Sequence, residues 1–339
     1  MSLIAGAIMR HREFIAFAGA AAAAWPLAGS AQQRGAQRRL GVLMGYVAND
    51  PEGAADAAAL LQGLGALSWK EGSNLRIDWR WGGSDPALFE RYAAELVALG
   101  PDLLLAGSSS TATGALHGLT SSIPIVFVNI TDPVGQRFVA SLARPGGNIT
   151  GFSNYDPLMV TKWLAMLTQL TPPVARVAVL YNPATAPYAP LLLHSIEEAA
   201  PVLAVAVRAA PVKDRAEIET TIAALADEER GGLVVLPDAF NNSHRDAIVA
   251  IAARHRLPAV YAFRLFALAG GLMSYGIDLV DGYLSSAAYV DRILKGTAPA
   301  DLPVQAPVTF KLVINLKTAK ALGFTISPTL LGAVDEVLE

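Results

Sequence analysis

Residues 103–116, LLLAGSSSTATGAL, give the clearest indication of the fold. A short apolar run ends at Gly107, three serines and a threonine follow, and a helical pattern begins within a few residues. A strand that turns directly into a helix is the first half of a βαβ unit on a parallel sheet. The turn also leaves hydroxyl groups and free backbone N–H groups at a helix N-terminus, which favours an anion such as a ligand carboxylate. An ordinary serine N-cap uses the same residues, so both interpretations of the turn stay open.

The same alternation of strand and helix extends in both directions from this stretch. Before residue 143, we predict strands at 39–44, 74–81, 102–107 and 124–129. The alternation breaks at a turn rich in glycine and proline, and it then resumes with strands predicted at 176–182, 202–208, 232–238 and 258–263. The sequence therefore predicts an α/β protein with two doubly wound parallel-sheet lobes and a ligand at the carboxyl ends of the strands.

The division of the chain between the lobes follows from its last part. After residue 270 the pattern is strand, helix, strand and helix, so the chain can return to each lobe in turn. We predict lobe 1 over 38–150 and 276–305, and lobe 2 over 151–275 and 306–339. Several crossings between two lobes form a hinge. A chain of 339 residues is long enough for two cores.

The N-terminus has the pattern of an export signal. A basic segment precedes the apolar run 14–27, and small residues end at Ala31. The apolar run is shorter than the ~20 residues that span a bilayer. We expect 1–31 to be a signal peptide cleaved near Ala31 and the mature protein to be periplasmic, with Met1 or Met9 as the start.

Bulk composition argues against several classes of function. The net charge is −3, and the 26 Lys and Arg residues form no basic run, so nucleic acid is a poor ligand. The absence of cysteine removes disulfides, thiol catalysis and cysteine metal sites. The sequence contains no G-x-S-x-G, H-E-x-x-H or histidine pair at i, i+4. An enzyme therefore has less support, although a catalytic arrangement of distant residues stays open, and we expect no metal and no cofactor.

Side chains suited to a small zwitterion follow the predicted strand ends. Helix N–H groups would hold its carboxylate, an aspartate its ammonium group, and aromatic rings its apolar part. For each ring, packing in the core is an equally good explanation, and Asp132 and Asp238 also suit turns or caps. The candidate residues are Tyr46, Ser108, Ser109, Ser110, Thr111, Asn129, Asp132, Tyr181, Asn182, Asp238, Tyr261 and Tyr275, with Phe263 as a further ring.

Four longer segments resemble a known family. They are VNITDPVGQRFVASLARPGGNITGF (128–152), LPDAFNNSHRDAI (236–248), AGGLMSYGIDLVDGY (269–283) and FKLVINLKTAKALGFTISPTLL (310–331). These segments are similar to ABC transporter substrate-binding proteins related to tryptophan and tyrosine binders, and the resemblance covers essentially all of the chain after the leader. It implies the type 1 periplasmic binding fold, whose two α/β lobes close on a ligand.

The resemblance also implies a function. It implies capture of a small amphipathic solute, such as an aromatic or branched amino acid or a related carboxylate, and its delivery to an ABC permease in the inner membrane. A monomer suits that role. The residues it implies are Ser108–Thr111 and Asn129–Asp132 in lobe 1, with Tyr181, Asn182, Asp238 and Tyr261 in lobe 2. The alternatives are a secreted enzyme using Asp132 and Asp238 across the cleft, and a sensor subunit for a membrane receptor.

Three positions depart from the pattern of the family. His11 separates Arg10 from Arg12, where many members have the consecutive arginines of twin-arginine export, so Sec export is equally open. Arg137 stands where relatives often have a small residue, and YLSSAAYV (283–290) replaces a typically basic segment. We expect Arg137 to alter the rim of the cleft and the segment 283–290 to alter a surface.

Overall fold

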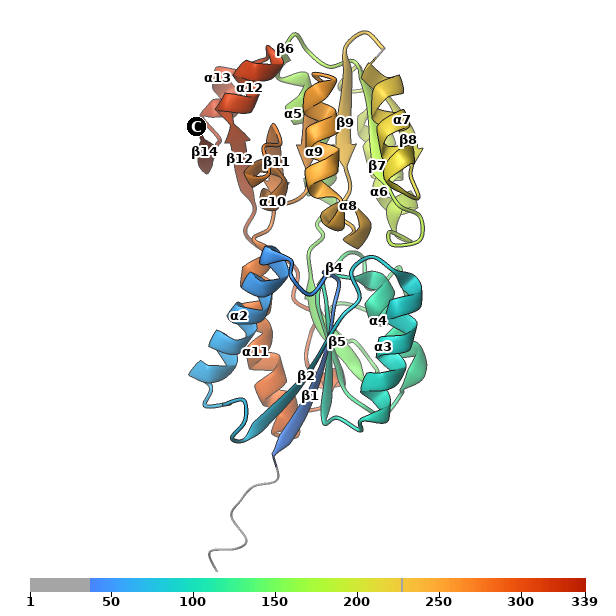
Figure 1. The fold of residues 1–339 in the computed structure, drawn as a ribbon, viewed down its shortest axis with the longest axis vertical. Helices are drawn as coiled ribbons and strands as arrows, with labels where there is room; N and C mark the ends of the chain where they lie inside the picture. Colours follow the sequence, from blue (N-terminus) through green and yellow to red (C-terminus); the bar gives the residue numbers. More distant parts are fainter. Residues whose placement is uncertain (1–36, 227) are drawn as a thin grey trace, which may run out of the picture.

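The computed structural model describes residues 37–226 and 228–339, which form two lobes stacked end to end (Figure 1). The signal peptide expected over 1–31 lies outside the described residues. No helix of the described residues is both long and apolar enough to cross a bilayer.

The first lobe is a five-stranded parallel sheet with the order β2-β1-β3-β4-β5 and helices on both faces. Its strands are β1 (Arg38–Met44), β2 (Leu75–Trp81), β3 (Leu103–Gly107), β4 (Ile125–Ile130) and β5 (Ile149–Ser153). Its helices are α2 (Pro51–Ala66), α3 (Pro86–Ala98), α4 (Ser110–Leu119) and α11 (Leu279–Leu294), followed by the short η1 (Pro299–Asp301).

The pleat of the strands builds a core on each face of this sheet. Met44 packs in one core with Leu60 of α2 and Tyr283 of α11, whereas its neighbour Leu43 packs in the other with Phe89 of α3. Every residue of β3 and β4 is buried, as expected for inner strands of a parallel sheet covered on both faces.

The second lobe is a seven-stranded sheet with the order β14-β12-β11-β10-β9-β7-β8, in which β12 runs antiparallel to β11 and the other neighbours are parallel. Its strands are β7 (Arg176–Tyr181), β8 (Ala206–Pro211), β9 (Gly231–Val235), β10 (Ala259–Tyr261), β11 (Met273–Gly276), β12 (Lys311–Asn315) and β14 (Glu336–Leu338). Its helices are α5 (Pro157–Thr168), α6 (Ala189–Ala199), α7 (Arg215–Ala226), α8 (Ala239–Ser243), α9 (Arg245–Arg254), α10 (Arg264–Leu268), α12 (Leu316–Leu322) and α13 (Pro328–Leu331). A small antiparallel pair consists of β6 (Leu170–Thr171) and β13 (Thr325–Ile326).

The predicted fold class is confirmed, with local differences. The strand expected at 202–208 lies at Ala206–Pro211, because the chain turns after α6 and Ala204 takes a left-handed φ of 53°. The segment 143–154, where the alternation breaks at a turn expected over 145–147, contains β5 in its second half, where Ile149–Ser153 is fully buried and pairs with β4. The glycine and asparagine in that segment conceal a short, buried strand at the edge of the sheet.

The chain passes between the lobes three times. It leaves lobe 1 after β5, returns between β11 and α11, and enters lobe 2 again before β12. We propose that residues 38–150 and 276–305 form lobe 1 and that residues 151–275 and 306–339 form lobe 2. The reason is that α11 packs against α2 of lobe 1, while β11 and β12 pair in the sheet of lobe 2. The pairing of β5 with β4 extends the first part to Ser153.

Candidate ligand-binding site between the lobes

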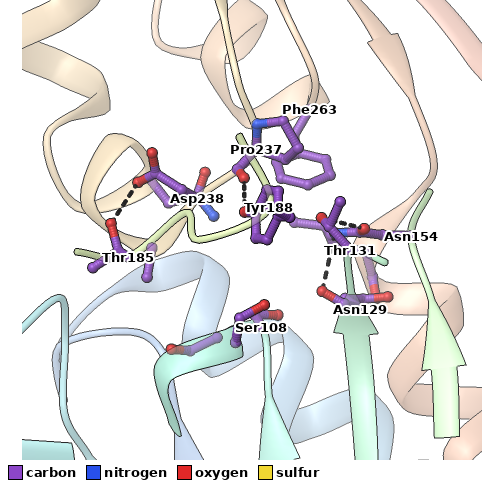
Figure 2. A pocket seen from close by; sticks show the side chains of 14 residues that line it. Ser108, Asn129, Thr131, Asn154, Thr185, Tyr188, Pro237, Asp238 and Phe263 are labelled. Carbon is purple, nitrogen blue, oxygen red and sulfur yellow. Dashed lines mark hydrogen bonds between the residues drawn. The ribbon is translucent and has the colours of Figure 1, made fainter. Parts of the chain in front are cut away.

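The carboxyl ends of strands from both sheets meet between the lobes, and the residues that follow them enclose a small cavity (Figure 2). The volume of this cavity is about 10 Å³, roughly the space of one water molecule. The lobes are therefore closed on each other. The lining residues are Ser108, Ser109, Ser110, Asn129, Thr131 and Leu279 from lobe 1, Asn154 from the crossing after β5, and Thr185, Tyr188, Pro237, Asp238, Ala239, Asn242 and Phe263 from lobe 2.

The serine turn lies against the cavity, and its backbone conformation is specific. Ser108 has a left-handed φ of 54°, and its hydroxyl lies 3.0 Å from that of Tyr283. Ser109 is the N-cap of α4 and accepts a hydrogen bond from the Ala112 N–H at 3.1 Å. The Ser110 N–H, at the first position of α4, has no acceptor within the helix, and Ser110 lines the cavity. The turn is therefore both an N-cap and a place that can receive an anion.

A hydrogen-bonded cluster at the ends of β4 and β5 forms the wall beside this turn. The Asn129 amide donates to the Leu279 carbonyl at 2.9 Å, and Asn154 donates to the Asn129 carbonyl at 3.0 Å. Thr131 donates to the Asn154 side-chain oxygen at 2.8 Å. The Asn129 Oδ1 atom is buried and has no partner among the described residues. A Cβ added at Gly282 would collide with this atom, so the oxygen points toward the start of α11 rather than into the cavity.

Asp238 is the main charged group on the opposite side of the cavity. It is the N-cap of α8, and its carboxylate accepts from the Asn182 N–H at 3.1 Å, the Thr185 hydroxyl at 3.2 Å and the Asn241 N–H at 2.7 Å. All three donors are neutral. Burial raises the pKa of Asp238 to about 7, although the N–H donors oppose that shift. A cationic ligand group beside it would favour the ionised form.

Further groups of lobe 2 complete the site. Asn242 of α8 presents a buried Oδ1 that has no partner in the described part of the chain. The Tyr188 hydroxyl donates to the Pro237 carbonyl, and burial raises its pKa, so the phenol stays neutral. Phe263, which is 4% exposed, is the other ring in the lining. No group of three or more His, Asp or Glu residues suited to a metal occurs in the described residues.

The structure brings some of the candidate residues together at this cavity. The predicted binding residues in the lining are Ser108, Ser109, Ser110, Asn129 and Asp238. Thr131, from the candidate segment Asn129–Asp132, and Phe263, the further candidate ring, line the cavity as well.

The other candidates lie elsewhere. Thr111 and Asp132 line a neighbouring groove of about 640 Å³ between α4 and the segment around Pro187. Tyr46 and Tyr261 are each 1% exposed, and Tyr261 stacks on Phe266 in the lobe 2 core.

The last three candidates belong to lobe 2. Tyr181 packs against the lobe 2 core at the end of β7, and the Tyr275 hydroxyl accepts from Lys162 at 2.7 Å. Asn182 acts on the cavity indirectly, because its N–H donates to Asp238.

Seven residues of the lining were not predicted from the sequence. Asn154 follows β5, a strand that was not predicted either. Thr185 and Tyr188 lie in the loop after β7, beyond the first two positions that were considered. Asn242 lies one helical turn after Asp238, a spacing that could have indicated it. The seven residues are Asn154, Thr185, Tyr188, Pro237, Ala239, Asn242 and Leu279.

Two closing lobes with polar strand ends around one cavity define a solute-binding protein. Residues 49–338 match the ABC transporter substrate binding protein family, and the chain belongs to this family. The resemblance noted from the four sequence segments is thereby confirmed.

Individual relatives agree with this assignment. A tyrosine-binding protein of Clostridioides difficile (strain R20291) is 27% identical over 263 residues, which are 77% of this chain and 74% of that protein. The structure of the ABC domain in complex with L-Trp from Streptococcus pneumonia has a TM-score of 0.82 and 27% identity, covering 89% of this chain and all of that one. A conserved domain protein from Vibrio cholerae has a TM-score of 0.82 and 29% identity, covering 89% and 99%.

Proposed function

We propose that this protein is the extracytoplasmic solute-binding component of an ABC importer, and that it holds a small amphipathic amino acid with an aromatic side chain between its lobes. The observation that carries the proposal is the buried Asp238 carboxylate, which accepts from neutral donors and faces the same cavity as the first turn of α4. The wall with Asp238 suits the positive charge of a zwitterion, and the wall with the N-terminus of α4 suits its negative charge.

Each part of the ligand has a matching group. The carboxylate would accept from the Ser110 N–H at the start of α4. The ammonium group would donate to Asp238. The aromatic side chain would pack on Phe263 and Tyr188. The binding of L-Trp and tyrosine by relatives supports this choice within the wider class of amphipathic solutes.

Entry of the solute requires the lobes to separate. A cavity of about 10 Å³ cannot take an amino acid as it stands. The three crossings between the lobes support a hinge that opens the site and closes again around the ligand, with a larger cavity than the one between the lobes here. Delivery to a permease of the inner membrane, export to the periplasm and action as a monomer belong to the same proposal.

The arrangement of the carboxylates favours binding over catalysis. An enzyme using Asp132 and Asp238 needs both groups at one reacting centre. Asp238 lines the cavity, whereas Asp132 lines the neighbouring groove. A solute recovered chemically unchanged after long incubation with the protein would agree with the proposal, and formation of a product would contradict it.

A thermal-shift and calorimetric panel tests the ligand class. We expect L-Trp, L-Tyr or L-Phe to stabilise the protein, by about 2.7 kcal/mol at 100 times the dissociation constant. Indole-3-propionate, which lacks the ammonium group, and tryptamine, which lacks the carboxylate, are expected to bind at least tenfold more weakly. Equal binding of indole-3-propionate and L-Trp would remove the ammonium role of Asp238, and no shift with any aromatic amino acid would refute the ligand class.

A further inference from the structure

An ion pair joins the two lobes beside the cavity. Arg245, at the start of α9 in lobe 2, donates from Nη1 to the Asp50 Oδ2 atom of lobe 1 at 2.7 Å. Only 12% and 7% of the two side chains are exposed. The residues are 195 positions apart and belong to different lobes. The contact therefore exists only while the lobes are together.

Both ends of this ion pair are anchored. Asp50 is the N-cap of α2, and its Oδ1 atom accepts from the N–H groups of Glu52 and Gly53 at 2.9 and 3.4 Å. One carboxylate oxygen thus caps the helix and the other receives Arg245. On the other side, the same Nη1 of Arg245 donates to the Asn242 carbonyl at 3.0 Å.

The anchoring in lobe 2 connects the ion pair to the ligand cavity. Asn242 lies in α8, lines the cavity and presents a buried Oδ1 to which no described residue donates a hydrogen bond. Arg245 holds the backbone of this residue while it binds Asp50. One guanidinium group therefore holds both the contact between the lobes and the backbone of a residue that lines the cavity.

We propose that Asp50 and Arg245 form an interlobe latch that stabilises the closed conformation and positions Asn242 toward the ligand. This inference rests on the closing function proposed above. When the lobes open, Asp50 still caps α2 and Arg245 becomes hydrated, so the open state loses little. A contact present in one of two states shifts their equilibrium, and apparent affinity changes with the fraction of binding-competent protein.

The substitution Asp50→Asn separates the latch from the helix cap. Asparagine caps helices as well as aspartate does, so the start of α2 is preserved. The amide removes the negative charge and turns its NH2 group toward Arg245. We expect the ratio of closed to open protein to fall about tenfold to hundredfold, the range for a hydrogen bond to a charged group.

The chain offers a matched control. Asp85 caps α3 in the same lobe, accepts from the Ala87 N–H at 2.9 Å and precedes a proline, as Asp50 does. It is exposed and forms no ion pair among the described residues. Asp85→Asn therefore removes the same charge from the same kind of cap without touching the latch, and we expect less than a twofold change.

Two readouts test the latch in the full chain. Because the sequence has no cysteine, one introduced in each lobe allows single-molecule energy transfer to report the closed fraction without ligand. Calorimetry with L-Trp as the probe reports affinity. We expect Asp50→Asn and Arg245→Gln to lower both, and the double variant to be no worse than either alone.

The outcomes separate this inference from the proposed function. If Asp50→Asn and Asp85→Asn give the same closed fraction, or if the effects of the two latch substitutions simply add, the latch is refuted. If L-Trp and the other aromatic amino acids fail to bind the wild-type chain, the ligand proposal fails. The energy-transfer measurement then still decides whether the latch exists.

Discussion

Binding of a zwitterion should release a proton from Asp238. Burial raises the pKa of this carboxyl to about 7, so at pH 6 about 90% of the ligand-free closed sites are protonated. An ammonium group beside Asp238 requires the carboxylate. We expect proton release on binding of L-Trp that is larger at pH 6 than at pH 8, with affinity falling as the pH is lowered below 7.

Calorimetry in buffers of different ionisation enthalpy measures this release directly. Burial and the nearby Asp238 charge raise the pKa of the Tyr188 phenol. The phenol therefore stays neutral over this pH range and does not contribute to the measured proton release. Asp238→Asn is expected to abolish both the proton release and the pH dependence. Binding of L-Trp at pH 6 by the wild-type protein without proton release would refute the pairing of the ammonium group with Asp238.

Three further substitutions test other parts of the structure. Burial raises the pKa of Asp56 to about 8, so the folded state holds this proton more tightly than the unfolded state, and stability is lost as pH rises from about 4 to 8. Asp56→Asn should flatten that loss when denaturant unfolding is compared at pH 6 and pH 9. Ser109→Ala removes the acceptor for the Ala112 N–H and should lower unfolding free energy by about 1 kcal/mol, measured in urea. Gly107→Ala places a methyl group against the Tyr283 hydroxyl, and a loss of about 1–3 kcal/mol in the same assay is expected.

The sequence could predict the part of the site that depends on sheet topology alone. Parallel strands bring their carboxyl ends to one edge, so the positions of Ser108–Ser110, Asn129 and Asp238 follow from the predicted strand ends. The positions of Tyr188 and Thr185 do not follow from the predicted strand ends, because these residues lie several positions into a loop whose path depends on packing between the lobes. Asn154 follows a strand hidden in a glycine-rich segment.

The aromatic candidates show a second reason why some residues predicted to bind the ligand do not line the cavity. A ring at a strand end can point into the core or into the cleft, and both environments stabilise it. Tyr261 stacks on Phe266 inside lobe 2, whereas Phe263, two residues later, reaches the cavity. The face that a terminal strand residue presents depends on where the strand stops, and element boundaries are what a sequence indicates least well.

Buried groups without hydrogen-bond partners affect the free energy of closing the lobes, together with the latch and the ligand. In the closed arrangement, the Oδ1 atoms of Asn129 and Asn242 are buried without partners among the described residues, and Asp238 must be protonated or remain an unpaired charge. Each unsatisfied buried acceptor costs about 1–3 kcal/mol, so closing without a ligand is opposed by the site itself. The ion pair of Arg245 and Asp50 offsets part of that cost. A zwitterion that brings an ammonium group to Asp238 removes the cost at that carboxylate, so its binding shifts the equilibrium toward the closed state.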